Sequence, residues 1–431
     1  MTGGGLLGPE PLSGLLVVEL STGVLGPMCG VYLSDMGAEV IKVEPPGGDL
    51  ARCARGAGNT LPREAASPFF AAVNRGKRSV VLDGLSEAGR TALRRLVGTA
   101  DVFLSNYRPE ALERLGVDEE AVRPGNERLV YAVATGFGPT GSDAGRPMVD
   151  GSGQARGGLA AVTGPQGEAA LAGAVVADSA GGMLLALGVV TALLGRERSG
   201  TGQRVETSAL GGQLWLQSWE LAHASMTGFR PVPAGAHHPI FAGVYGLYRT
   251  ADDAWLFIAG IPDPDDWLTF CAFGDIDSAA RDPRWDTNQK RTGFDPSVST
   301  DEANQLRPDI ARAIGRHTLA EWEQFLQARP EIISHRVQDY EQVLRDPQGV
   351  ANGYFAQVDV FGAGPQRLVG NVVALSQTPG SVKDGPPVLG ADTTEVLQSL
   401  GYTAADAGVL VADAAEALVR RLPAMHLKPT D

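Results

Sequence analysis

The residues whose types and spacing best suit chemistry lie in the segment VVADSAGGMLLALG, residues 175–188. Asp178 precedes an apolar stretch with helical character, so we expect a half-buried carboxylate beside the positive end of a helix. That helix end favours the ionised, nucleophilic form, whereas burial opposes it. Gly181 and Gly182 each cost a helix about 1 kcal/mol relative to Ala, which suggests that another group approaches the backbone closely. The alternative interpretation is an ordinary N-cap aspartate, worth about 1 kcal/mol.

Two arginines lie in a second candidate segment, SNYRPEALERLG, residues 105–116. Asn106 and Arg108 directly follow a predicted strand, and Pro109 suits the first turn of a helix. In open α/β sheets ligands bind beyond the carboxyl ends of the strands, where arginines beside a helix start suit phosphate or pyrophosphate. The alternative is a solvated helix start with ordinary surface arginines.

Glycines follow the first predicted strand at positions 23, 26 and 30, and Glu44 ends the next strand. A dinucleotide site requires the spacing G-x-G-x-x-G, which this loop does not have. The loop therefore indicates either a turn that handles another nucleotide or a plain tight turn without a ligand. His237 and His238 lie in a loop rich in Pro and Gly, which is typical of a polar turn and less so of a lid. No His or Cys spacing indicates a metal site, and no G-x-S-x-G motif indicates a serine hydrolase.

Alternating strands and helices must position these groups. The pattern predicts strands at 15–20, 38–44, 79–82, 102–104 and 129–134, with helices ending near 35 and spanning 87–97 between them. Such alternation predicts a parallel, Rossmann-like sheet with right-handed crossovers. Further on we expect helices at 177–198 and 213–226, a strand at 255–260, a helix at 319–327, a strand at 354–361 and a helix at 394–400. A change in composition near residue 230 predicts a smaller second domain.

Composition narrows the classes of partner. The 431 residues carry a formal net charge of −14, which argues against nucleic acid or an anionic membrane as the main partner. The three cysteines are far apart, so we expect reduced thiols and a cytoplasmic location. The start MTGGGLLGPEPLSG lacks the features of a signal peptide, and the apolar run Met183–Leu194 is shorter than a bilayer requires.

The chain resembles the class III CoA-transferases, which include formyl-CoA:oxalate and carnitine CoA-transferases. The resemblance runs nearly end to end, and the order and spacing of the matching segments carry it. Those segments are GPMCGVYLSDMGAEVIKVEPPGGD, NRGKRSVVLD, ADVFLSNYRPEALERLG, ADSAGGMLLALGVVTALLGRERSGTGQRVETS, EQVLRDPQ and PPVLGADTTEVLQSLGY.

The resemblance implies an α/β fold in which a Rossmann-like large domain is built from both chain ends and a smaller α+β domain is inserted. We expect the large domain at 1–230, the small domain at 231–334 and the returning C-terminal part at 335–431. The resemblance also implies an interlocked homodimer in which each chain threads through the other.

The resemblance further implies that Asp178 carries the acyl group, as an anhydride and then as an aspartyl-CoA thioester, while CoA moves from an acyl-CoA donor to a carboxylic acid acceptor. Backbone amides from Ser179 to Gly182 are candidates to stabilise developing oxyanions. CoA is expected as the thioester substrate and no metal is expected. The implied CoA-binding residues are Val24, Leu25, Lys42, Leu82, Asn106, Tyr107, Arg108, Arg114 and Arg146.

Departures from the family pattern narrow the expected substrates and reactions. Val24 stands where some members carry Gln, and the glycine run of oxalate-specific members is not evident in GAHHPIFAGVYG, residues 235–246, so oxalate is not inferred. The alternative function is that of the related 2-methylacyl-CoA racemases, which share the aspartate and pair it with a histidine. That histidine would precede Asp150, where this chain has Val149. Without the second base, two-sided proton exchange is difficult, and transfer is favoured.

Overall fold

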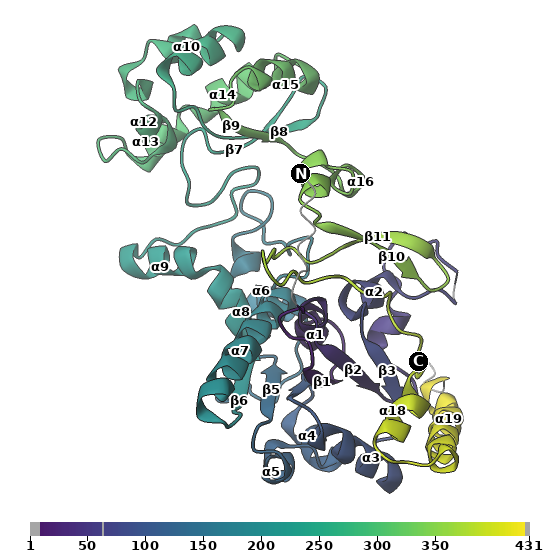
Figure 1. The fold of residues 1–431 in the computed structure, drawn as a ribbon. Coiled ribbons are helices and arrows are strands. Elements are labelled where there is room, and N and C mark those ends of the chain that lie inside the picture. Colours follow the sequence, from purple (N-terminus) through teal and green to yellow (C-terminus); the bar gives the residue numbers. More distant parts are fainter. Residues whose placement is uncertain (1–8, 63, 427–431) are drawn as a thin grey trace. The chain divides into compact units, whose positions relative to one another are not determined.

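The computed structural model describes residues 9–62 and 64–426, so the absence of a signal peptide, expected partly from residues 1–8, falls outside it. The chain forms two compact units (Figure 1). Unit 1 comprises Met1–Arg156, Ala174–Leu216 and Leu344–Asp431, and unit 2 comprises Gly157–Gly173 and Gln217–Val343. These boundaries differ from the bounds predicted for the small domain, residues 231 and 334. One reason is that Gly167 and Gly235 donate backbone hydrogen bonds to Pro233 and Gly164, which joins residues 164–167 to residues 233–235.

Unit 1 contains a six-stranded sheet in which every neighbouring pair of strands is parallel, in the order β3-β2-β1-β4-β5-β6. The predicted α/β class and the five predicted strands are confirmed. The sixth strand was not predicted, because its sequence RVETS is polar. This strand lies at the edge of the sheet, and most of its residues are half-exposed. The strands are β1 (Leu16–Leu20), β2 (Glu39–Glu44), β3 (Arg78–Val81), β4 (Val102–Ser105), β5 (Val130–Thr135) and β6 (Arg204–Ser208).

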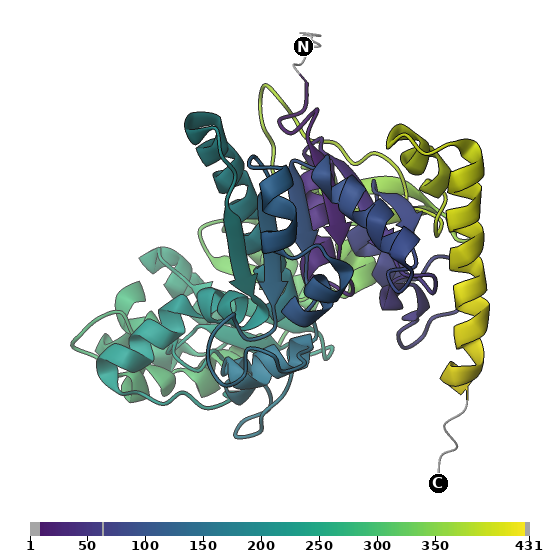
Figure 2. The same cartoon turned by 90° about the horizontal axis from the view of Figure 1, so that it is seen from below.

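Helices cover both faces of this sheet, with a separate apolar core on each. On one face lie α1 (Leu25–Asp35) and α7 (Ala177–Ser199). On the other lie α3 (Glu87–Gly98), α4 (Pro109–Leu115), α18 (Thr393–Ser399) and α19 (Ala404–His426). Figure 2 shows α19 in yellow beside the rest of unit 1. Unit 1 also contains η1 (Leu50–Cys53), α2 (Pro68–Asn74), α5 (Glu119–Val122), η2 (Arg123–Gly125), α6 (Asp150–Arg156), α8 (Ala209–Leu216), α17 (Pro347–Ala351), β10 (Phe355–Val360) and β11 (Gly364–Val369).

The C-terminal part of the chain returns to this sheet through specific bonds to β3. The Asp392 carboxylate accepts a hydrogen bond from the Ser79 amide at 2.8 Å, and the Thr393 hydroxyl accepts one from the Val81 amide at 3.0 Å. The start of α18 therefore satisfies backbone donors on the open edge of the sheet, which ties residues more than 300 positions apart.

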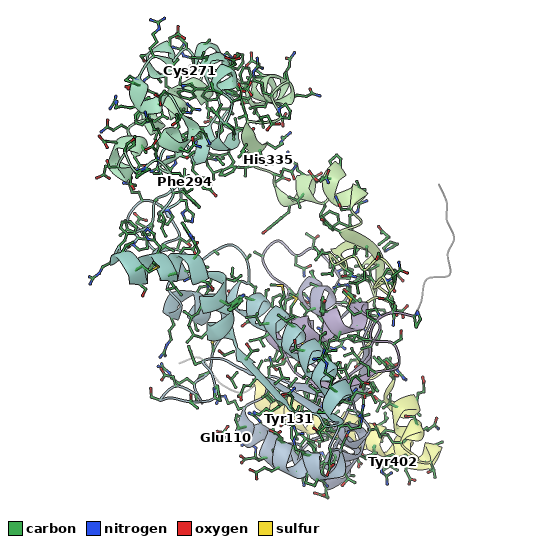
Figure 3. All side chains as sticks on the ribbon, turned by 60° about the vertical axis from the view of Figure 1, so that its left-hand side comes forward. Glu110, Tyr131, Cys271, Phe294, His335 and Tyr402 are labelled. Atoms are coloured by element: carbon green, nitrogen blue, oxygen red, sulfur yellow. The ribbon has the colours of Figure 1, made fainter. Side chains whose placement is uncertain are left out.

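Unit 2 is built around an aromatic core that includes Trp267, Phe270, Trp322 and the buried Cys271 labelled in Figure 3. Its sheet has the order β7-β8-β9 and is antiparallel. The predicted helix at 213–226 is interrupted, because α8 ends at Leu216 and α9 begins at Ser218. Unit 2 consists of η3 (Leu159–Ala161), α9 (Ser218–Thr227), β7 (Gly246–Arg249), β8 (Trp255–Gly260), α10 (Pro264–Phe273), α11 (Asp277–Ala280), η4 (Pro283–Trp285), α12 (Asn288–Thr292), α13 (Thr300–Asn304), α14 (Arg307–Ile314), α15 (Leu319–Gln327), β9 (Ile333–Arg336) and α16 (Tyr340–Val343).

Helix α7 is longer than the apolar run noted in the sequence. Its 23 residues are long and apolar enough to cross a bilayer by length and composition, and half of its most apolar stretch is buried within the structure. The prediction concerned only the run Met183–Leu194, and the helix that contains this run extends beyond it at both ends. Length and composition are weak evidence for a membrane span, because a helix packed on a sheet, as α7 is, meets the same criteria.

The glycines at the start of α7 are explained by close packing of helices. A Cβ atom on Gly182 would lie 2.6 Å from the Leu25 carbonyl oxygen and 2.7 Å from the Met28 Cβ of α1. A Cβ on Gly212 of α8 would lie 2.3 Å from the Gly181 amide nitrogen. The close approach predicted from the sequence is therefore made by neighbouring helices.

We predict that Gly182→Ala destabilises the protein by about 2 kcal/mol, because the added methyl group meets backbone that must move. Gly195→Ala in the same helix is the matched control, since its Cβ would approach only the end of the Gln203 side chain, at 3.3 Å. We expect the control to change stability by about 0.5 kcal/mol or less. Urea unfolding of both variants measures the difference, and equal midpoints would contradict the packing argument.

Candidate active site

The candidate site is a cavity of about 370 Å³ at the carboxyl ends of the central strands of unit 1. Strands β1 and β4 are neighbours, and β2 continues the sheet on one side while β5 continues it on the other. This reversal is the switch point at which open α/β sheets bind their ligands. The cavity is lined by Thr22, Gly23, Val24, Leu25, Leu50, Asn106, Tyr107, Arg108, Pro109, Ala134, Thr135, Gly136, Ala144, Arg146, Pro147, Met148, Val149, Asp178 and Ala209.

Most of the residues predicted from the sequence meet in this cavity. Asp178 comes from the start of α7, and its neighbours in the lining come from the loops after β1 and β4 and from the segment before α6. The predicted residues that line the cavity are Val24, Leu25, Asn106, Tyr107, Arg108, Arg146 and Asp178.

Three predicted residues do not line it. Lys42 has no exposed surface, and its ammonium group is held inside the protein. Leu82 is 4% exposed and belongs to the apolar core under α3. Arg114 is exposed in the last turn of α4, away from the cavity lining.

Both polar atoms of the Asn106 side-chain amide are hydrogen-bonded to the loop after β1. Its Oδ1 accepts a hydrogen bond from the Thr22 amide at 2.9 Å, and its Nδ2 donates to the Thr22 carbonyl at 2.7 Å. Asp49 holds the same loop, because its Oδ1 accepts from the Thr22 hydroxyl at 2.6 Å and from the Gly23 amide at 3.2 Å. Gly23 itself has φ of +76°, a conformation that favours glycine. The loop that carries Val24 and Leu25 is thus fixed from two sides.

A buried network of charges supports this loop. The Lys42 ammonium lies 3.0 Å from Glu19 Oε1 and 2.9 Å from Asp49 Oδ2, and it donates to the Ser21 carbonyl at 2.9 Å. Lys77 pairs with the other oxygen of Glu19 at 2.7 Å. Burial raises the pKa of Glu19, but Lys77 and Lys42 outweigh it and hold that pKa below its usual value. Burial lowers the pKa of Lys77 to about 8 despite Glu19.

The two remaining glycines of the first glycine pattern, Gly26 and Gly30, leave room for residues of this network. A Cβ on Gly30 would lie 1.9 Å from Glu19 Oε2, and one on Gly26 would lie 2.5 Å from the Ser21 Cβ. Both positions require glycine because helix α1 packs directly over the charged groups. The glycine pattern is therefore explained by packing, and no ligand is needed to account for it.

Asp178 is half-buried in the second position of α7, since the helix begins at Ala177. The alternative that Asp178 caps the helix is therefore wrong. Asp150 takes that role, because its Oδ1 accepts hydrogen bonds from the Ala177 amide at 2.7 Å and the Asp178 amide at 3.3 Å. Its Oδ2 accepts a third, from Gln154 Nε2, at 2.6 Å.

The pKa of the Asp178 carboxyl group lies close to neutral pH. Burial raises its pKa, and the nearby negative charge of Asp150 raises it further, to about 6. At neutral pH the group is largely ionised, and among the described residues the named influences on its pKa are burial and Asp150. Such a carboxylate is a better nucleophile than one neutralised by a salt bridge.

The backbone amides proposed as oxyanion donors are only partly available. The Ala180 amide donates to the Val176 carbonyl at 3.0 Å within the helix. Gly181 and Gly182 lie against α8 and α1, so their backbones are covered by packing.

Cations at the mouth of the cavity come from two arginines. Arg108 is exposed at the N-cap position of α4. The Arg146 side chain is 65% exposed and lies 3.3 Å from Asp143. Exposed guanidinium groups of this kind suit the phosphates of a nucleotide ligand.

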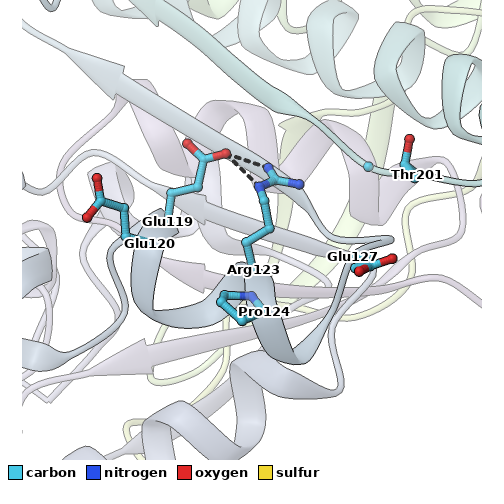
Figure 4. Close-up of a pocket in the computed structure, with 7 residues that line it drawn as sticks. Glu119, Glu120, Arg123, Pro124, Glu127 and Thr201 are labelled. Carbon is cyan, nitrogen blue, oxygen red and sulfur yellow. Dashed lines mark hydrogen bonds and ion pairs between the residues drawn. The ribbon is translucent and has the colours of Figure 1, made fainter.

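Larger recesses on unit 1 are acidic and suit a phosphate-bearing ligand poorly. One of about 670 Å³ is lined by Glu119, Glu120 and Glu127 with Arg123, whose guanidinium already donates to Glu119 at 2.8 and 2.5 Å (Figure 4). A second, of about 500 Å³, includes Glu110 and Tyr131, both labelled in Figure 3. Volume alone therefore does not identify the site.

The histidines noted in the loop at 237–238 both pack against aromatic rings, and His237 lies 5.4 Å from the ring of Tyr248. His238 lies 4.8 Å from the ring of Phe241, which stacks on Tyr245 at 4.5 Å and on Trp219 at 5.1 Å. Burial lowers the pKa of His238. No group of three His, Cys, Asp or Glu side chains that could hold a metal occurs within residues 9–62 and 64–426.

Comparison with known proteins identifies the family. Residues 12–393 match the model for CoA-transferase family III. The chain belongs to CoA-transferase family III. It is 32% identical over 406 residues to the succinate–glutarate CoA-transferase of Agrobacterium fabrum, covering 90% of this chain and 96% of that protein. It is 34% identical over 318 residues to the acetyl-CoA:oxalate CoA-transferase of Acetobacter aceti, covering 72% of this chain and 77% of that protein.

Solved structures agree with this placement. A CAIB/BAIF family protein from Brucella suis matches with a TM-score of 0.78 and 28% identity, over 91% of this chain and 100% of that one. An alanine variant of an aspartate in Rv3272 from Mycobacterium tuberculosis matches with a TM-score of 0.74 and 28% identity, over 90% of this chain and 99% of that one. The chain is therefore an enzyme, a CoA-transferase that acts between acyl-CoA and carboxylic acids.

Some residues that shape the site were not predicted from the sequence. Asp150 is one of them, because nothing in the local sequence reveals that it caps a helix 27 residues later. The hydrogen bond between Thr22 and Asp49, which holds the loop after β1, was also not predicted. The turn PPGGD could have drawn attention to Asp49, since an aspartate after glycines often bonds to nearby backbone amides.

We predict that the initial rate of CoA release from an acyl-CoA rises with pH and levels off above about pH 7, with a midpoint near the Asp178 pKa of about 6. Protonation removes the negative charge of this carboxyl group, so the rate is expected to fall as pH drops through that pKa. Asp150→Asn removes the neighbouring negative charge and shifts the midpoint to lower pH. Rates at pH 5 to 8 measure both effects. Glu416→Gln, on the exposed side of α19, is the control, and an unshifted midpoint in Asp150→Asn would argue against the coupling.

Proposed function

We propose that this CoA-transferase works by covalent catalysis on Asp178. The carboxylate attacks the thioester carbonyl of the donor, the C–S bond breaks, and a mixed anhydride and free CoA thiolate form. The thiolate attacks the Asp178 carbonyl, which gives an aspartyl-CoA thioester and releases the donor acid. The acceptor carboxylate then displaces CoA from Asp178, and CoA attacks the acceptor acyl carbonyl of the new anhydride. Acceptor-CoA leaves, and the Asp178 carboxylate is restored.

One observation carries this proposal. Among the described residues that line the switch-point cavity, Asp178 is the carboxylate, and it is half-buried and largely ionised at neutral pH. An anhydride and a thioester of a carboxylate are close in energy, so each step is reversible, as a transferase requires. The loop held by Asn106 and Asp49 lines the same cavity as this carboxylate.

The proposed position of CoA follows from charge. Its phosphates are expected beside Arg108 and Arg146 at the mouth, and its thiol is expected beside Asp178. Asn106 and Lys42 are assigned a supporting part instead, because their polar groups are already engaged by the protein. The expected cytoplasmic location stays a prediction.

Racemisation of a 2-methylacyl-CoA is not favoured. Val149 occupies the position of the expected histidine, lines the same cavity as Asp178 and has no titratable group. One base cannot both remove and return a proton on opposite faces of carbon 2. Exchange of the hydrogen on carbon 2 of the acyl-CoA with solvent would support racemisation instead.

We also propose that the enzyme is an interlocked homodimer. Met183, Leu187 and Leu194 lie on one face of α7 and are 56%, 62% and 56% exposed, and Trp215 on α8 is 67% exposed. Apolar surface of this extent is typical of subunit interfaces. A second set of exposed apolar side chains, between residues 350 and 373, is also consistent with a subunit interface. Those side chains are Val350, Tyr354, Phe361, Val369, Val372 and Val373.

Replacement of the nucleophile tests the covalent mechanism. We expect Asp178→Ala to abolish turnover while CoA still binds, because the lost carboxylate forms the covalent bond. Intact-mass spectrometry of the wild-type enzyme with a panel of acyl-CoAs, followed by hydroxylamine trapping and peptide mapping, is expected to place the adduct on Asp178. Turnover by Asp178→Ala, or an adduct elsewhere, would rule the mechanism out.

A charge on the exposed face of α7 tests the dimer. Leu187→Glu is expected to weaken self-association about tenfold or more, since a carboxylate would be buried at the interface. Leu85→Glu is the control, because Leu85 is 74% exposed in the loop before α3. Sedimentation velocity over a concentration series measures both. A monomeric wild-type enzyme, or a variant that dimerises as tightly as wild type, would contradict the proposal.

A further inference from the structure

Three charged side chains of unit 1 meet beside the candidate active-site cavity. Two arginines share the Asp143 carboxylate: its Oδ1 lies 3.3 Å from Arg146 Nη1, and its Oδ2 pairs with Arg156 Nη1. Arg146 lines the cavity, as do its neighbours Ala144 and Pro147. Arg156 is the last residue of α6 and is not part of that lining. The shared carboxylate therefore brings a second guanidinium group close to one that lines the cavity.

Arg156 is held in place by contacts within unit 1. Its guanidinium group lies over the ring of Phe137, 4.9 Å from the ring centre, in a favourable cation–π contact. The Arg146 amide donates a hydrogen bond to the Asp143 carbonyl at 3.0 Å, so these two residues belong to one turn. Within unit 1 the side chains of Arg146 and Arg156 remain 65% and 46% exposed. Both guanidinium groups are thus close together and open to a ligand.

The charges of this group suit an anion that carries more charge than a carboxylate. Arg156 and Arg146 hold the pKa of Asp143 below its usual value, so its carboxylate is ionised at neutral pH. One carboxylate neutralises only one of the two arginines, and the group keeps a positive charge. A phosphate group also presents pairs of oxygens to guanidinium groups, and its greater charge pairs better with two arginines.

From this geometry we infer that Arg146 and Arg156 together bind a phosphate group of CoA, and that Asp143 occupies the place of this phosphate in the free enzyme. When CoA binds, phosphate oxygens replace the Asp143 carboxylate between the two guanidinium groups. Arg156 is then a further CoA-binding residue, and Asp143 limits the affinity for CoA by competing for the same arginines. This inference rests on the proposed position of CoA beside Arg146.

Removal of the competing charge is the first test. We expect Asp143→Asn to bind CoA about 3- to 10-fold more tightly than the wild-type enzyme, because the phosphate no longer has to displace two exposed ion pairs. Isothermal titration of the full chain with CoA measures this. Glu87→Gln is the matched control, because Glu87 on α3 is likewise shared by Arg90 at 2.7 Å and Arg94 at 2.8 Å and lies outside the cavity lining. We expect the control to leave CoA affinity unchanged.

Removal of the second cation is the second test. We expect Arg156→Gln to weaken CoA binding about tenfold, because one of the two charge-assisted contacts to the phosphate is lost. The loss is expected to shrink at high salt, since exposed charges are screened. Arg90→Gln is the control. Dephospho-CoA, which lacks the 3′-phosphate, shows which phosphate is bound: an equal loss with both ligands assigns the diphosphate, and a loss with CoA alone assigns the 3′-phosphate.

Arg146→Gln separates this inference from the proposed position of CoA. If Arg146→Gln weakens CoA binding and Arg156→Gln leaves it unchanged, the inference is overturned and the proposed position stands. If neither variant changes CoA binding, or the wild-type enzyme does not bind CoA, both are overturned. Unchanged or weaker CoA binding by Asp143→Asn overturns the competition. Melting temperatures of all variants show whether each change in affinity reflects a folded protein.

Discussion

The buried ammonium group of Lys42 is the interaction on which the site depends. It joins Glu19 at the end of β1, the Ser21 carbonyl just beyond that strand and Asp49 beyond β2, all within 3.0 Å. Removing one partner from such a group leaves an uncompensated buried charge, which typically costs about 3–5 kcal/mol. Asp49 in turn holds the loop at Thr22. The position of that loop is therefore set by electrostatics inside the sheet.

Packing connects this loop to Asp178, the proposed nucleophile. Leu25 begins α1, and its carbonyl oxygen lies so close to Gly182 that no side chain fits between them. Helix α7 can approach only because its first turn contains glycines. Asp150 then caps that turn and places the Asp178 carboxylate at the cavity. The position of the Asp178 carboxylate therefore depends on residues such as Lys42, Asp49 and Asp150, which do not line the cavity, as in preorganised sites.

The electrostatics of the site divides it into two regions. The exposed Arg108 and Arg146 supply positive charge to the cavity lining, whereas the carboxyl group of Asp178 lies near the negative charge of Asp150. A ligand with anionic phosphates at one end and an uncharged thioester at the other matches this division.

Much of the fold and part of the site could be predicted from the sequence. Continuous apolar runs such as Val130–Ala134 can satisfy both faces only as buried parallel strands, so the sheet was predictable, whereas the polar edge strand Arg204–Ser208 was not. Asp178, Asn106 and Arg108 were found because each follows or precedes an element at a strand end or helix start, where ligands bind.

Only the tertiary structure decided the role of each of these groups. Asn106 and Lys42 carry polar atoms that could contact a ligand, yet the fold uses them to hold a loop. Asp150 caps a helix 27 residues away, and no local pattern encodes a contact of that separation. The sequence determined which residues can be ionised, buried or helical. Whether an ionised group is paired or left free depends on which distant segments lie within about 4 Å of it, and packing alone sets that distance.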